Sequence, residues 1–310
     1  NKFLAGESPE ELVSYIRKDP SLKITGSADT TPFDQPLFRE DTALYSGFIK
    51  GYKPEILGNS FFLVFKNLVT GTGYGYVIDI AADGSFSEKV PLPYPQTARM
   101  EILPFSGSVF LEPGKSIFQL IDLCTNTSEY SGESARLNYD LDLLKDVNSF
   151  DYNEMRKNIV HQSPEEYKST CLQNLERDIK ALDSITKEHK FCTKAYQIAR
   201  MDMEYIYASH ILDYDWYYRS AYREQNNLST PVMEIPLDVE PLTPGYFDFL
   251  TEDLLNNPVG FYSKNYDAFL HSFKNIAITR PGDDFIAVAG NHSLIDLVRK
   301  LKIAGYPISD

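Results

Sequence analysis

The hydrophobic pattern of this chain changes its period near the middle, and that change limits the possible folds more than any other feature. Over residues 46–122, short apolar runs alternate with turn residues, which is typical of paired β-strands. Over residues 151–227, apolar residues recur at spacings of three and four, which is typical of packed helices. A chain of 310 residues is long enough for two domains. We therefore expect an α+β, multidomain protein in which an antiparallel β-sandwich is followed by an all-α helical domain.

Turn signals and composition place the boundaries between these parts. Residues 1–42 are expected to hold a short helix, beginning at the capping sequence Ser8-Pro9-Glu10-Glu11, and then an extended connector. Residues 43–125 are assigned to the antiparallel β-sandwich, and residues 126–310 to the helical domain.

Alternation predicts the strands of the expected sandwich. Residues 74–80 and 86–92 alternate on either side of Asp83-Gly84, which predicts a hairpin. Residues 61–65 are apolar at every position, as in a strand that is covered on both faces. The sequence Glu112-Pro113-Gly114-Lys115 predicts a turn, and residues 117–121 are expected to form the last strand.

Capping residues and helical spacing predict the helices. The sequence Ser163-Pro164-Glu165-Glu166 can cap and start a helix. A longer, largely apolar helix is expected from Thr193 past Tyr218, at the centre of a bundle. Shorter helices are expected over residues 245–255 and 262–275, and a final amphipathic helix over residues 294–301.

Composition excludes several classes of partner. The chain has 30 basic and 44 acidic residues, a formal net charge of −14, and such a surface repels nucleic acid and anionic membranes. No apolar stretch approaches the roughly 18 to 20 residues needed to span a bilayer, so we expect no transmembrane segment. Cys124, Cys171 and Cys192 are too widely spaced for a Cys-x-x-Cys redox or zinc motif. Cys171 lies on the apolar stripe of a predicted helix, where we expect a buried thiol.

No motif points to a catalytic, cofactor or metal site. The alternating glycines of residues 71–75 precede a strand, whereas a phosphate cradle requires a helix after the loop. Asp213 and Asp215 are two apart on a predicted helix and cannot easily converge on one cation, so a solvated acidic face or a pair between Asp213 and His210 is favoured. The remaining histidines show no zinc spacing.

The aromatic cluster Tyr214, Trp216, Tyr217 and Tyr218 is the one candidate for ligand or partner contact. Exposed rings could stack against a sugar or a peptide side chain. Burial between helices is the competing interpretation, because aromatic residues at helical spacing usually pack in a core.

Five motifs, three in the N-terminal half and two in the C-terminal half, point to one family. The first three are Ser46-Gly47-Phe48-Ile49-Lys50-Gly51-Tyr52, Ala82-Asp83-Gly84-Ser85-Phe86 and Phe110-Leu111-Glu112-Pro113-Gly114-Lys115. The other two are Gly245-Tyr246-Phe247-Asp248-Phe249-Leu250 and Tyr266-Asp267-Ala268-Phe269-Leu270. From about Thr31 to Ile276, these motifs resemble, in order, the β-sandwich and the helical middle region of the non-catalytic part of TlpA-like thiol–disulfide oxidoreductases.

In that family these regions precede a thioredoxin-fold module of the AhpC/TSA type, whose Cys-x-x-Cys has no counterpart here. The resemblance therefore carries over no catalytic residue and implies no cofactor. It implies export to the periplasm or cell envelope, often with a lipid anchor in the parent protein. We expect a non-catalytic accessory region that positions or recruits partners, with a thioredoxin-fold module or a client protein as the partner. The alternatives are a module that binds glycan or peptide near Trp216, and a hydrolase with residues gathered from distant loops.

Overall fold

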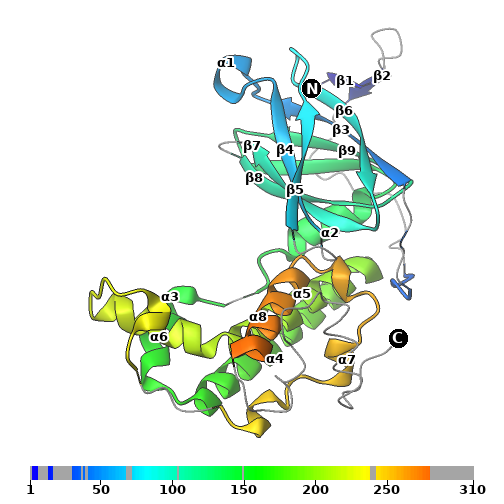
Figure 1. Ribbon diagram of the computed structural model, residues 1–310. Helices are drawn as coiled ribbons and strands as arrows, with labels where there is room; N and C mark the ends of the chain where they lie inside the picture. The colour runs from blue at the N-terminus through cyan, green and yellow to red at the C-terminus, as the bar shows by residue number, and fades with distance from the viewer. Residues whose placement is uncertain are drawn as a thin grey trace.

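The computed structural model describes residues 2–5, 13–16, 30–35, 38, 41–67, 72–102, 105–148, 150–237 and 242–279. The N-terminal half contains two four-stranded sheets and the C-terminal half is helical, so the chain is α+β as predicted (Figure 1). In Figure 1 the sheets lie above the helices, and α2 (Ala135–Leu144) lies at the junction between them.

The two sheets have different pairing patterns. In the first sheet the spatial order is β10 (Thr127–Gly132), β9 (Ser116–Asp122), β3 (Asp41–Lys50) and β6 (Ser85–Leu92). In the second it is β5 (Thr72–Asp79), β4 (Ser60–Asn67), β7 (Gln96–Ile102) and β8 (Phe105–Leu111), and the short helix α1 (Pro54–Leu57) precedes β4. The second sheet is antiparallel, but β3 and β9 pair in parallel. The expectation of antiparallel pairing throughout is therefore wrong.

The turn at Asp83-Gly84 crosses from one sheet to the other, so the predicted hairpin is wrong. β6 pairs with β3, and β5 pairs with β4. Ile78 and Val90 are both fully buried, although they lie in different sheets. Alternation correctly predicted which side chains are buried, because a side chain's facing has a period of two in any strand. It contains no information about which strand lies alongside.

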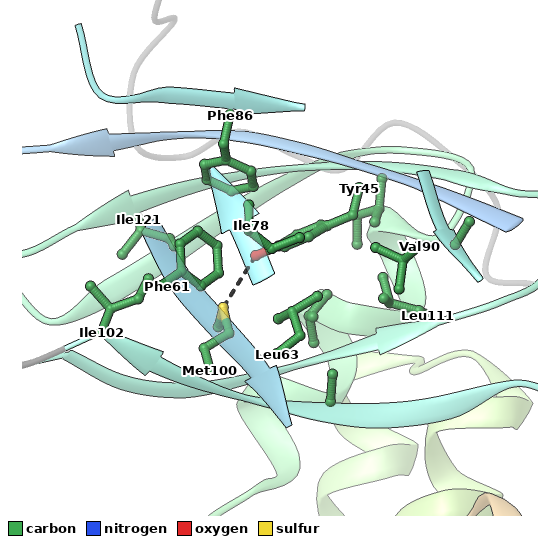
Figure 2. Packing of buried hydrophobic residues seen from close by; sticks show 14 of the residues in the cluster. Tyr45, Phe61, Leu63, Ile78, Phe86, Val90, Met100, Ile102, Leu111 and Ile121 are labelled. Carbon is green, nitrogen blue, oxygen red and sulfur yellow. Dashed lines mark hydrogen bonds between the residues drawn. The ribbon is translucent and has the colours of Figure 1, made fainter. Parts of the chain in front are cut away.

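Both sheets contribute side chains to one hydrophobic core. Figure 2 shows Tyr45 of the first sheet and Leu63 and Met100 of the second within this core. The buried Tyr45 hydroxyl donates a hydrogen bond to Gln119 Oε1 at 2.8 Å and also lies 3.1 Å from Met100 Sδ. Phe62 is 48% exposed, so β4 is covered on one face only and the prediction of a doubly covered strand is wrong. The apolar run at residues 61–65 thus includes one exposed phenylalanine.

The predicted turn at residues 112–115 is confirmed. Lys115 N donates to Glu112 O at 3.1 Å, and Gly114 has a φ of 79°, which glycine adopts without the steric cost that a Cβ would bring. The strand predicted to be the last is followed by β10, which pairs with β9 and continues the first sheet past residue 125.

The helical half follows the predicted pattern in its long elements. Its helices are α2, α3 (Tyr152–Asn158), α4 (Pro164–His189), α5 (Thr193–Leu212), α6 (Tyr214–Gln225), α7 (Glu252–Leu255) and α8 (Tyr266–Thr279), with 3₁₀ turns η1 (Ile159–His161), η2 (Val232–Glu234), η3 (Pro244–Phe247) and η4 (Gly260–Tyr262). The capping box at Ser163 and Glu166 starts α4 as predicted. The long central helix instead ends at Leu212, and α6 begins after Asp213 as a separate helix.

Two predicted helices at the ends of the chain have different outcomes. Val13–Ile16 forms β2 and pairs with β1 (Lys2–Ala5), so the helix expected to begin at Ser8 is wrong over that span. The amphipathic helix expected over residues 294–301 lies outside the described residues.

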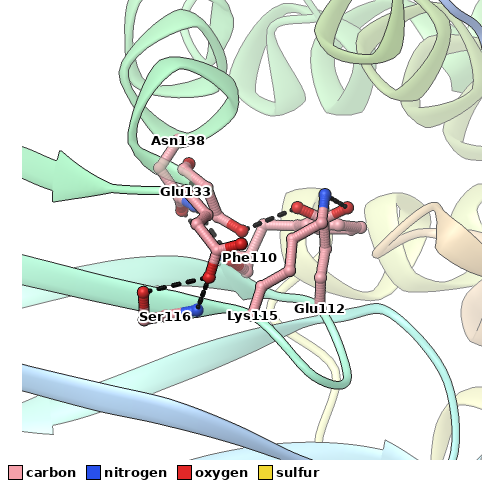
Figure 3. Close-up of polar contacts among 7 residues, drawn as sticks. Phe110, Glu112, Lys115, Ser116, Glu133 and Asn138 are labelled. Carbon is pink, nitrogen blue, oxygen red and sulfur yellow. Dashed lines mark hydrogen bonds and ion pairs between the residues drawn. The ribbon is translucent and has the colours of Figure 1, made fainter.

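Asn138 of α2 joins the helical half to the edge of the second sheet (Figure 3). Its Oδ1 accepts from Phe110 N at 2.7 Å, and its Nδ2 donates to Phe110 O at 2.8 Å. The Asn138 side chain therefore forms the two main-chain hydrogen bonds that a neighbouring strand would otherwise form with Phe110 of β8. Beside it, Glu112 accepts from Ser134 Oγ at 2.7 Å, and the Phe110 side chain is buried in the helical core. The two halves thus share both a polar clamp and a hydrophobic contact.

We predict that Asn138→Ala lowers the free energy of unfolding by about 2 to 4 kcal/mol, because it leaves the buried N–H and C=O of Phe110 without partners. Urea denaturation measures this loss. Asn153→Ala on the exposed surface of α3 is the matched control and should change stability by less than about 0.5 kcal/mol. Equal losses in both variants would contradict the role of the clamp.

Candidate functional site

A groove of about 630 Å³ lies in the helical half between α4, α5 and residues 249–257. This volume is within the range of about 300 to 1,000 Å³ that is typical of ligand sites. Its apolar lining comes from three separate segments, and includes Leu172, Leu175, Ala208, Ile211, Phe249 and Leu254. The sequence did not predict this groove, because its walls come from parts of the chain that helical spacing alone cannot bring together.

The polar rim of the groove carries three charged residues. Arg200 and Glu204, one turn apart on α5, form an ion pair with an Nε to Oε1 distance of 2.9 Å. Arg200 Nη1 also donates to the Tyr196 hydroxyl at 3.3 Å, and that hydroxyl donates to Asp183 at 2.7 Å. Asp253 of α7 is exposed and forms no ion pair with any other residue that the structure describes. Among the described residues, the rim therefore has one negative charge without an ion-pair partner.

A segment of the N-terminal connector lies at the mouth of the groove. Pro32 lines the groove, and the next residue, Phe33, is held by Gln197 of α5. Phe33 N donates to Gln197 Oε1 at 2.8 Å, and Gln197 Nε2 donates to Phe33 O at 2.9 Å. The N–H and C=O of one residue point in the same direction when its backbone is extended, so a single amide side chain can bind both. The helical half thus already binds one extended segment beside the groove.

One wall of the groove is fixed by a buried polar contact. The Tyr207 hydroxyl of α5 donates to Asp178 Oδ2 of α4 at 2.7 Å, and Asp178 is 2% exposed. Burial raises the pKa of Tyr207. The contact links the two long helices that line the groove.

The structure divides the predicted aromatic cluster into buried and exposed rings. Tyr214 is 1% exposed and its hydroxyl donates to Gln162 O at 2.7 Å, so it belongs to the core. Trp216 is 46% exposed, whereas Tyr217 and Tyr218 are half-buried. Tyr218 packs near Tyr214, and Tyr217 contacts Trp216 with the two rings nearly perpendicular. The four residues therefore do not form a single exposed platform.

His210 lies behind this cluster in a polar contact that the sequence did not predict. Its Nδ1 is 3.1 Å from the Tyr217 hydroxyl, and its Nε2 is 3.4 Å from the Tyr152 hydroxyl. Its ring stacks on Phe150 at a centroid distance of 4.0 Å. Burial lowers the pKa of His210 to about 4. Tyr152 is 58 residues away in the chain, so no local spacing could have revealed the contact.

The expected pairing of Asp213 with His210 is not the one that forms. Asp213 accepts from Ser272 Oγ of α8 at 2.6 Å, and Asp215 accepts from Arg219 at 3.0 Å. The break between α5 and α6 at Asp213 ends the regular helical spacing on which the expectation depended. In the ranges that the structure describes, no three His, Cys, Asp or Glu side chains gather closely enough to hold a metal ion.

The three cysteines are all free and have different environments. Cys171 and Cys192 are buried, as expected for Cys171, and burial raises the pKa of each thiol to about 12. Cys124 is exposed near the start of the β9–β10 turn.

A smaller cavity of about 130 Å³ lies between the two halves, against β7, β8, α2 and α5. Asp202 on its wall accepts from Ser263 Oγ at 2.6 Å and from Lys264 N at 3.0 Å. Because these donors occupy the carboxylate, the contact fixes the segment before α8.

Comparisons with family models, curated proteins and solved structures find no match to this chain. Among the described helices, none has both the length and the apolar composition needed to cross a bilayer.

We predict that His210 makes stability depend on pH. Its pKa is about 4 in the folded protein, below the usual value of about 6.5 for an unfolded chain, so the stabilisation is complete above pH 6.5 and is lost as the pH falls towards 4. The loss should be about 3 kcal/mol by urea denaturation at stepped pH. His210→Phe should lack this part of the pH dependence, while His189→Gln at an exposed position should retain it. Identical pH profiles for all three proteins would contradict the assignment.

Proposed function

We propose that this chain is a non-catalytic accessory region of an exported, TlpA-like thiol–disulfide oxidoreductase, and that it recruits a client polypeptide for a thioredoxin-fold module. In this proposal the two sheets are the β-sandwich of that family, the helical half is the recruiting domain, and the protein works in the periplasm or cell envelope. The sequence motifs of both halves support the relationship.

The groove between α4 and α5 is the observation that carries the proposal. It has the volume of a ligand site, and its apolar floor is formed by partly buried side chains such as Leu172 and Phe249. A segment of an unfolded client offers apolar side chains that could fill such a floor. We propose a client segment as the occupant because the same helices already hold the extended backbone at Phe33.

The junction between the halves supports a positioning role. Asn138 bonds both main-chain groups of Phe110, and the Phe110 ring is 1% exposed within the helical core. A region held in this way presents its groove in a fixed orientation relative to the sheets. Fixed orientation raises the effective concentration of a bound client near a neighbouring module.

The environments of the two buried cysteines support a non-catalytic role. A thiol must ionise before it can attack a disulfide. Burial raises the pKa of Cys171 and Cys192 to about 12, so very little thiolate forms at neutral pH. Their side chains also lie in two separate hydrophobic clusters. This chemistry suits a chain that binds clients and leaves electron transfer to another module.

We predict that the purified chain binds reduced, carbamidomethylated ribonuclease, a permanently unfolded probe, and does not reduce insulin. Leu172→Gln should weaken binding about tenfold, because it places a polar amide on the apolar floor of the groove. Isothermal titration calorimetry measures the affinity. Leu143→Gln on α2, where the leucine is 51% exposed and outside the groove, is the matched control. Turnover of insulin, or equal binding by both variants, would refute the proposal.

A second candidate function, binding of a glycan near Trp216, is favoured by one observation. Trp216 is 46% exposed and Tyr152 is 45% exposed, and both rings contact Tyr217. Exposed aromatic rings fixed on two helices, α3 and α6, can stack against the apolar face of a sugar.

Trp216 is the only tryptophan in the chain, so its fluorescence reports on this surface alone. If the second candidate is correct, titration with chitohexaose or cellohexaose should shift or quench the emission, and Tyr152→Ala should reduce the effect severalfold. Acrylamide quenching supplies the control that the indole is accessible. An emission spectrum that no oligosaccharide changes, in a chain that acrylamide quenches, would exclude these glycans.

A further inference from the structure

We infer that the α4–α5 groove selects an extended peptide in which apolar residues alternate with lysine or arginine. This inference rests on the proposed function and identifies the chemistry of the client segment. The charges on the rim, the connector seated at the mouth of the groove, and the apolar floor support it independently.

The charge balance of the three charged residues that line the groove favours a basic ligand. Of the three charged lining residues, Arg200 and Glu204 neutralise each other at 2.9 Å. Arg200 also donates to the Tyr196 hydroxyl, so two of its nitrogens have partners within the protein. Asp253 of α7 has no ion-pair partner among the described residues and is exposed. A cationic side chain beside Asp253 would gain an ion pair, whereas a carboxylate would be repelled.

The connector supports a peptide as the occupant rather than a small molecule. The side chain of Gln197 forms hydrogen bonds with the N–H and C=O of Phe33. This kind of contact recognises the main chain of an extended peptide and does not depend on which side chain it carries. The Phe33 ring lies 4.5 Å from the ring of Tyr262, between centroids, and so enters the helical core. Because Pro32 lines the groove, the surface that seats this segment is continuous with the groove itself. A second extended strand of polypeptide would therefore meet a surface that already accommodates one.

The arrangement of the floor explains the alternation. The apolar lining comes from both long helices, with Leu172 and Leu175 on α4 and Ala208 and Ile211 on α5, while the charged lining residue Asp253 is on α7. In an extended peptide, successive side chains point to opposite sides. Every second residue can then enter the apolar floor, while the residues between them point outwards to the rim.

Three acetylated and amidated peptides test the inference by isothermal titration calorimetry: Leu-Lys-Phe-Lys-Leu, and the same peptide with glutamine or glutamate in place of both lysines. The lysine peptide should bind up to about fivefold more tightly than the glutamine peptide, because one of its cations can form a partly exposed ion pair with Asp253. The glutamate peptide should bind most weakly.

Variants then assign the selectivity to the groove. Asp253→Asn should reduce the ratio of the affinities for the lysine and glutamine peptides to about twofold or less. Glu252→Gln, in the same turn but outside the groove lining, is the matched control and should retain the full preference. Leu172→Gln should lower the affinity for all three peptides about tenfold, while Leu143→Gln should leave these affinities unchanged.

The outcomes separate this inference from the proposed function. Tightest binding by the glutamate peptide, or a lysine preference that survives Asp253→Asn, would overturn the inference but leave the groove as the recruiting site. No binding by any peptide, or equally tight binding by hexylamine, would also overturn it, and the unfolded ribonuclease would then decide the proposed function by itself. Peptide binding that Leu172→Gln does not weaken would count against both.

Discussion

The clamp between Asn138 and Phe110 is the interaction on which the arrangement of this molecule depends. β8 is the edge of its sheet, and the N–H and C=O of Phe110 are buried at that edge, where unpaired polar groups are costly. Asn138 satisfies both, and the same α2 that carries it packs on α5 through the helical core. A polar requirement of the sheet therefore determines where the helices attach.

Gln197 uses the same chemistry on the connector. Its amide bonds the N–H and C=O of Phe33, as that of Asn138 bonds those of Phe110. The rings of Phe33 and Phe110 lie 6.1 Å apart, so the two clamps hold neighbouring side chains in one shared core. The junction and the mouth of the groove are thus parts of one continuous structure, which is why a ligand in the groove would be held in a defined relation to the sheets.

Most of the secondary structure could be predicted from local patterns, and the failures have a common physical cause. The inward side chains of β5 and β6, the turn at Gly114 and the cap at Ser163 all depend on residues close in sequence. The hairpin at Asp83-Gly84 failed because pairing depends on which strands meet in space. At the aromatic cluster, the sequence could not show that Trp216 is exposed and Tyr214 is buried. Both are aromatic residues in the same predicted helix, so local spacing treats them alike.

The sequence by itself determined the class of the fold, the order of its two halves, the burial of Cys171 and the acidic net charge, because periodicity and composition are local or additive properties. Only the tertiary structure decided the parallel pairing of β3 with β9, the position of His210 between two tyrosines, and the groove between α4 and α5. Each of these needs residues from distant parts of the chain to meet, and their meeting depends on the packing of the whole core rather than on any single segment.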